Sequence, residues 1–117
     1  MSDLITFYRN TEQWIADAAY PKYGHPVNDR ELLEQLSPLR RADALRAPLL
    51  VVHGAHDTNV PIGESQQIVE ALRQAGREVR YLLFGDDGHG IAKRENRAAL
   101  AAAMSEWLNR AFAVTAV

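Results

Sequence analysis

The sequence contains no cysteine, no long apolar run and no excess of charge of one sign. The absence of cysteine excludes a disulfide framework and a thiolate zinc site, and it fits either redox compartment. The longest apolar runs are far too short to span a bilayer. With 13 Lys and Arg against 15 Asp and Glu, nothing indicates a surface that follows a nucleic-acid backbone. We therefore expect no nucleic-acid partner and no membrane partner.

The N-terminus also lacks a basic region followed by an apolar stretch, which is the signature of a secretory signal. Hydrophobic residues make up 47% of the 117 residues, enough for a core in a chain of about one domain. We expect a cytoplasmic protein folded as a single unit over residues 1–117.

The first third of the chain has the pattern of short helices. Apolar residues among polar ones predict one or two helices over residues 2–19, with Asn10 or Thr11 as an N-cap. Two prolines and a glycine predict a loop over residues 20–28. A short helix over residues 29–36 follows, and the Ser-Pro pair after it ends that helix.

The rest of the chain alternates strands with helices. Apolar runs at about 49–52 and 79–84 predict two strands, and the first has the pattern of a strand buried on both faces, which is usually parallel. Helical spacing predicts a crossover helix over 63–75 and a last helix over 93–113. The predicted fold class is α/β, with a small parallel sheet packed by helices. The last helix is expected to bury a stripe made of Leu100, Met104, Trp107, Leu108 and Ala111.

Polar residues suited to catalysis follow both predicted strands. Asp57 comes five residues after Val52, and His89 comes five residues after Phe84. Ligands bind beyond the carboxyl ends of parallel strands, and a crossover makes the two strands neighbours. A carboxylate that accepts the Nδ1 proton of an imidazole leaves Nε2 free as a general base. We predict that Asp57 and His89 meet as catalytic acid and base, with no cofactor and no metal.

Each of these residues also has a simpler interpretation. An aspartate after a strand most often forms a turn or caps a helix, and a histidine in a glycine-rich loop is usually a surface residue. A metal set is the other alternative, because imidazole and carboxylate groups suit zinc or iron. The spacing of its members matches no tight ligand motif. These members are His53, His56, Asp57 and His89.

Several segments together resemble a known family. They are Ser-Pro-Leu at 37–39, APLLVVHGAHDTNVP at 47–61, YLLFGDDGHG at 81–90 and Glu-Asn-Arg at 95–97. They resemble the end of the catalytic α/β-hydrolase domain in the prolyl oligopeptidase family, and most of all its acylaminoacyl-peptidase and dipeptidyl-peptidase-like branch. The resemblance covers essentially the whole chain. Gly85 stands where a proline is commoner, and His56 stands where a small polar or acidic residue is usual.

The resemblance implies a serine peptidase that acts on peptides or acyl-amino acids, with Asp57 and His89 in the positions of the triad acid and base. It also implies that the nucleophile elbow, the oxyanion-hole loop and six strands would precede Met1. The chain is then the C-terminal portion of an α/β-hydrolase fold, a truncated catalytic domain.

The nucleophile itself is missing from the sequence, which contains no G-x-S-x-G motif. No serine follows a strand on a sharp glycine-flanked turn, the geometry that exposes a nucleophile. We therefore expect the chain to be inactive alone. The four serines are Ser2, Ser37, Ser65 and Ser105.

Two interpretations of different class stay open. The chain is either the nucleophile-free part of a serine peptidase, or a non-catalytic binding or oligomerisation module derived from a hydrolase. A two-stranded sheet is marginal in water, and the strand at 49–52 would present an unpaired apolar edge. We therefore expect a homo-oligomer that forms through this sheet edge, most simply a symmetric dimer that extends the sheet or else buries the exposed face of the last helix.

Overall fold

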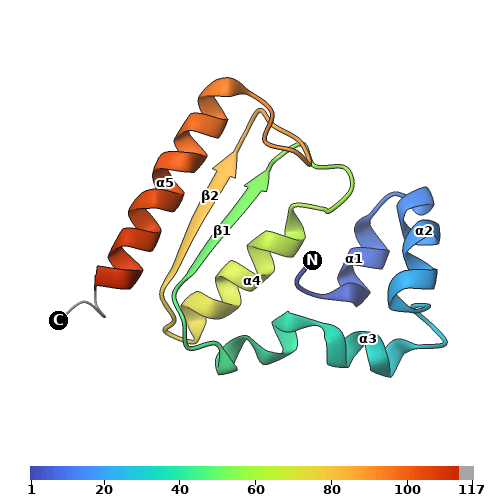
Figure 1. Ribbon diagram of the computed structural model, residues 1–117. Coiled ribbons are helices and arrows are strands. Elements are labelled where there is room, and N and C mark those ends of the chain that lie inside the picture. The colour runs from blue at the N-terminus through green and yellow to red at the C-terminus, as the bar shows by residue number, and fades with distance from the viewer. Residues whose placement is uncertain (114–117) are drawn as a thin grey trace.

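The computed structural model describes residues 1–113 and has the predicted α/β class (Figure 1). Its sheet consists of two parallel strands, with Leu49 opposite Val79 and Gly54 opposite Phe84. In chain order the elements are α1 (Leu4–Asn10), α2 (Gln13–Tyr23), α3 (Arg30–Leu36), the 3₁₀-helix η1 (Pro38–Ala44), β1 (Leu49–Gly54), α4 (Gly63–Gln74), β2 (Val79–Phe84) and α5 (Arg94–Ala113).

The crossover from β1 through α4 to β2 is confirmed, and it brings the carboxyl ends of both strands to the same edge of the sheet (Figure 1). Helix α4 packs through Val69 and Leu72, which are buried. It ends before Gly76, whose φ of 67° lies in the left-handed region that favours glycine after a helix.

The predicted burial of the first strand on both faces is wrong. β1 extends two residues beyond the predicted 49–52, but most residues of β1 and β2 are only half-buried. Each strand pairs on one side alone within residues 1–113, so the sheet is too narrow to be covered completely. Only Gly54 and Phe84, at the carboxyl ends, are buried.

The main hydrophobic cluster lies in the N-terminal helices instead of on the sheet. In Figure 1 these helices stand on the far side of α4 from the strands. Leu33 and Phe7 are almost inaccessible at its centre, with Tyr8 and Tyr20 in tilted ring contact at 5.2 Å. The buried members of the cluster are Leu4, Ile5, Phe7, Tyr8, Ala16, Ala19 and Leu33.

Two N-terminal predictions need correction. Neither Asn10 nor Thr11 is an N-cap: Asp3 caps α1 through its carboxylate, Thr11 closes α1, and Glu12 precedes α2 without a side-chain cap. The predicted loop over 20–28 begins later, because α2 continues to Tyr23 with Pro21 inside it. A proline so near the end of a helix removes one backbone hydrogen bond without ending the helix.

The expected core stripe of α5 is also wrong. Ala103 is the buried residue of this helix, while Met104 and Leu108 are each 47% exposed. Helix α5 stands beside β2 (Figure 1) and is joined to it by exposed ion pairs such as Arg80–Glu106. The other stripe residues are only half-buried against the narrow sheet, namely Leu100, Trp107 and Ala111. No helix within residues 1–113 is long and apolar enough to cross a membrane.

A candidate acid–base site at the ends of two strands

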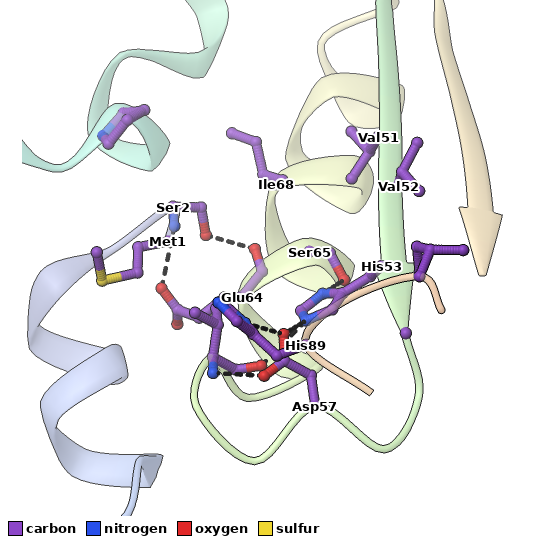
Figure 2. Close-up of a pocket in the computed structure, with 14 residues that line it drawn as sticks. Met1, Ser2, Val51, Val52, His53, Asp57, Glu64, Ser65, Ile68 and His89 are labelled. Atoms are coloured by element: carbon purple, nitrogen blue, oxygen red, sulfur yellow. Dashed lines mark hydrogen bonds and ion pairs between the residues drawn. The ribbon is translucent and has the colours of Figure 1, made fainter. Parts of the chain in front are cut away.

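Asp57 and His89, the two residues predicted to form the site, lie in contact. The Nδ1 atom of His89 is 3.0 Å from Oδ2 of Asp57, although the residues are 32 positions apart in the chain (Figure 2). Asp57 lies in the turn after β1 and His89 in the loop after β2. The parallel pairing of these strands therefore produces the contact that the sequence predicted.

The Asp57 carboxylate is held from two sides. Its Oδ1 atom accepts hydrogen bonds from the backbone N–H groups of Asn59 and Val60, each at 2.9 Å, and its side chain is only 5% exposed. Burial alone would raise the pKa of Asp57, but these backbone donors and the His89 imidazole more than offset it, so the pKa lies below its ordinary value. The group is an anion at neutral pH.

The loop that carries His89 crosses directly over the end of β1. The backbone N–H of Ala55 donates to the carbonyl oxygen of Phe84 at 2.8 Å. The backbone N–H of His56 donates to the carbonyl oxygen of Asp87 at 2.9 Å. At Gly54 the contact is so close that a Cβ atom would lie 2.1 Å from the Gly88 carbonyl oxygen. A glycine at position 54 is therefore a geometric requirement of this crossing.

Two carboxylates of the His89 loop attach it to the start of α5. The Nδ2 group of Asn96, in the first turn of α5, donates to Asp86 at 2.8 Å and to the buried Asp87 at 2.7 Å. Lys93 pairs with Asp86 at 2.6 Å. Hydrogen bonds from Lys93 and Asn96 lower the pKa of Asp86, and the bond from Asn96 chiefly lowers that of Asp87. Both groups hold the loop and do not contact Asp57.

A second imidazole also reaches Asp57, that of His53, which the sequence suggested only as a member of the alternative metal set. The Nε2 atom of His53 lies 3.2 Å from Oδ2 of Asp57 and 3.0 Å from the carbonyl oxygen of Val60. Its Nδ1 atom lies 2.7 Å from Oγ of Ser65, which is 2.7 Å from the Tyr81 hydroxyl. The available signal was the position of His53 four residues before Asp57, at the end of a strand.

The metal alternative finds no support in the part of the chain described. Within residues 1–113, no group of three His, Cys, Asp or Glu side chains could hold a metal ion. His56 is exposed, and both His53 and His89 direct a ring nitrogen to the same oxygen of Asp57.

The four serines are either engaged with other groups or exposed. Ser2 is buried and donates to the carbonyl of Glu64; Ser37 donates to the carbonyl of Leu33. Ser105 is exposed in the middle of α5, and Ser65 is held in the first turn of α4. Across residues 1–113, no serine hydroxyl forms a hydrogen bond with His89.

Two cavities adjoin His89. One, of about 370 Å³, extends from the Asp57–His89 pair along β1 towards Ile68 and the N-terminal segment. The other, of about 310 Å³, lies between His89 and helices α1 and α2 and is lined largely by apolar side chains. Phe7, Trp14, Ile15, Tyr23 and Val60 are among its walls.

Comparison with known proteins identifies relatives of this chain. Residues 1–115 match the sequence model of the family described as "Prolyl oligopeptidase family". Among curated proteins, the chain is 42% identical over 89 residues to dipeptidyl aminopeptidase BIII of Pseudoxanthomonas mexicana. That alignment covers 74% of this chain and 13% of the relative.

Solved structures give the same result. The chain superposes on the acylaminoacyl peptidase of Pyrococcus horikoshii with a TM-score of 0.85 and 26% identity, over 95% of this chain and 19% of that one. A puromycin-hydrolyzing peptidase of Mycobacterium tuberculosis gives a TM-score of 0.90 and 26% identity, over 95% of this chain and 17% of that chain. The α/β fold is thus that of peptidases in which this chain spans less than one fifth of the length.

Proposed function

Because this chain belongs to the prolyl oligopeptidase family, we propose that Asp57 and His89 are the acid and base of a serine-type peptidase. The observation that carries the proposal is the 3.0 Å contact between Nδ1 of His89 and a buried carboxylate oxygen of Asp57. The ionised Asp57 carboxylate can only accept hydrogen bonds, so Nδ1 of His89 donates and Nε2 of the neutral His89 ring carries no proton.

In this role the Nε2 atom of His89 takes the proton of an attacking hydroxyl group. The resulting imidazolium is stabilised by the Asp57 anion, and it returns the proton to the leaving amine when the acyl–nitrogen bond breaks. The hydroxyl comes from outside these 117 residues, since the four serines lie elsewhere and three of them are bound to other groups. The chain is therefore inactive alone.

Peptides or acyl-amino acids are the proposed substrates. The names of the relatives support this class, because dipeptidyl aminopeptidase BIII and the acylaminoacyl peptidase are both peptidases by name. The apolar cavity between His89 and α1–α2 supports an apolar side chain at the reacting residue, since its walls include Phe7, Ile15 and Val60.

Complementation tests the proposal. The chain is co-expressed with the preceding part of a relative's hydrolase domain, which carries a G-x-S-x-G turn, and the release of p-nitroaniline from dipeptide and acetyl-amino-acid anilides is measured. We expect activity with the pair and none with the chain alone. The variants His89→Ala and Asp57→Asn should lose it by about 10⁴-fold or more.

His56→Ala is the matched control, because this exposed histidine lies in the same turn and should leave the activity unchanged. A complemented His89→Ala variant as active as the wild type would overturn the proposal. Labelling of a serine in the isolated chain by a fluorophosphonate probe, abolished by His89→Ala, would overturn the proposed inactivity of the chain alone.

A second proposed function is assembly, and the open edge of β1 favours it. The N–H of Leu49 donates to the Glu78 carbonyl on the β2 side, so the backbone groups of Leu50 and Val52 point to the free edge. We propose a symmetric dimer that pairs two β1 edges. Light scattering at micromolar concentration should give a dimer, and Leu50→Pro, which removes an outward N–H group, should give a monomer. A wild-type monomer would contradict it.

A further inference from the structure

The Oδ2 atom of Asp57 is shared by two histidines with very different surroundings. His89 approaches from the loop after β2 with 59% of its side chain exposed. His53 approaches from β1 with 9% exposed, and Figure 2 shows its ring between Ser65 and Asp57. The first ring is free to meet a substrate, whereas the second is enclosed by the protein.

The hydrogen-bond partners fix where the protons lie on the enclosed ring. The Nε2 atom of His53 faces the Asp57 carboxylate and the Val60 carbonyl, which are acceptors only, so Nε2 carries a proton and donates it. In the neutral ring Nδ1 is then an acceptor and receives the Ser65 hydroxyl proton. The Ser65 hydroxyl proton has a second acceptor in the Ile62 carbonyl at 3.0 Å, and the Ser65 oxygen accepts from the Tyr81 hydroxyl.

These contacts form one directed chain of hydrogen bonds from β2 to the acid. It runs from Tyr81 to Ser65, then to His53 and finally to Oδ2 of Asp57. Ser65 is 6% exposed, and its hydroxyl also lies 3.0 Å from the Ile62 carbonyl. The order serine, histidine, aspartate is thus that of a catalytic triad, but this serine is enclosed and fully engaged, so it is a support and not a nucleophile.

We propose that His53 is a positioning residue for Asp57, held by Ser65 and Tyr81, whose Nε2–H group fixes the carboxylate oxygen that His89 contacts. The role in the reaction rests on the proposed function of the Asp57–His89 pair. The hydrogen bonds themselves do not rest on it, so they can be measured without any catalysis.

Removal of the His53 donor should change Asp57 in a measurable way. The carboxylate would keep its two backbone donors on Oδ1 but would have His89 as the sole donor on Oδ2. A buried anion that loses a donor is less stable relative to its acid form. The pKa of Asp57 should therefore rise from its lowered position towards its ordinary value.

The test is the titration of the Asp57 carboxyl carbon by NMR in the isolated chain, with amide spectra to verify folding. His53→Phe keeps a ring of similar size without a donor, and the titration midpoint should rise by about 0.5 pH unit or more. His53→Gln keeps an N–H donor and should stay within about 0.2 unit of wild type. His56→Phe, in the adjacent exposed turn, is the control for adding a ring and should cause no shift.

The same sample reports the tautomer. Long-range ¹H–¹⁵N spectra should show His53 protonated at Nε2, and Ser65→Ala and Tyr81→Phe should each alter its Nδ1 resonance. A folded His53→Phe variant with an unchanged Asp57 midpoint would overturn the proposal. So would a His53→Gln variant that behaves like His53→Phe, because packing of the ring would then be its only role.

The complemented enzyme separates the two proposals. His53→Phe should lower kcat about tenfold with KM within about twofold, because substrate contacts are unchanged while the pair is misplaced, and His53→Gln should restore kcat. If the complemented wild type and all variants are inactive, while the Asp57 titration midpoint still rises in His53→Phe, the proposed function alone is refuted. Active enzyme whose kcat is unaffected by His53→Phe would refute the positioning role alone.

Discussion

The backbones at Gly54 and Gly88 approach so closely that no side chain fits between them. A Cβ atom on Gly54 would lie 2.1 Å from the carbonyl oxygen of Gly88 and 2.7 Å from that of Asp87. Both obstacles are backbone atoms, which cannot move aside as a flexible side chain does. The neighbour of Gly88 is His89, so the spacing of the two strand ends determines where His89 lies.

Gly54→Ala should therefore displace the His89 loop. Forcing a methyl group into a closed contact typically destabilises a protein by about 1–3 kcal/mol, and we expect a loss at the upper end of that range in urea unfolding. Gly85→Ala is the matched control, because a Cβ at Gly85 meets nothing within 4 Å, and it should change stability by less than about 0.5 kcal/mol. Equal stabilities for the two variants would contradict the geometric requirement.

The Asp57 carboxylate should make stability depend on pH. Its pKa is lowered in the folded chain, so the stabilisation is complete above the pKa of the unfolded chain, about 4, and is lost as the pH falls through the folded pKa. Urea midpoints measured between about pH 6 and pH 2 should fall more steeply for the wild type than for Asp57→Asn. Parallel curves would show that the folded chain does not favour the anion.

Asn96 should hold the His89 loop in place. Asn96→Ala removes the amide that bridges Asp86 and Asp87 and leaves the buried Asp87 without its side-chain donor. We expect a loss of about 1–3 kcal/mol and faster amide exchange across residues 85–93. Asn109→Ala, at an exposed position of the same helix, should change neither quantity, and slow exchange in the Asn96 variant would refute the bracing role.

The buried Glu64 should attach the N-terminal segment to α4. Its Oε1 atom accepts from the backbone N–H groups of Ser2 and Asp3, each at 3.0 Å. Glu64→Ala leaves both donors buried without this partner, which should cost at least about 2 kcal/mol. Thermal unfolding measures both variants, and Glu70→Ala, at an exposed position of the same helix, should be nearly neutral. A Glu64 variant as stable as the Glu70 variant would refute the attachment.

The elements and the Asp57–His89 pair could be predicted because local patterns determine them. Apolar runs located both strands, helical spacing located α4, and the offset of each polar residue from its strand located the pair. The parallel crossover then left one arrangement, with both strand ends at one edge.

What escaped prediction depends on contacts distant in the sequence. Burial of β1 and of the α5 stripe depends on how wide the sheet is, which no local pattern states. The contact of His53 with Asp57 had only a weak local signal, its place four residues earlier at the end of a strand, because Ser65 and Tyr81, which contact its ring, come from α4 and β2. The continuation of α2 past Pro21 reflects its place near a helix end, where tertiary packing outweighs propensity.

The bond between the Thr11 hydroxyl and the carbonyl oxygen of Asn59, 2.8 Å long across 48 positions of chain, has a wider consequence. The N–H of Val60, in the same peptide unit as that carbonyl, donates to Oδ1 of Asp57, as does the N–H of Asn59, so this turn links the N-terminal helices to the Asp57 carboxylate. Heat or mutation that loosens the junction of α1 and α2 would reach the carboxylate through this residue. An alteration at the junction of α1 and α2 would therefore disturb the apolar cavity beside His89 and the support of the Asp57 carboxylate together.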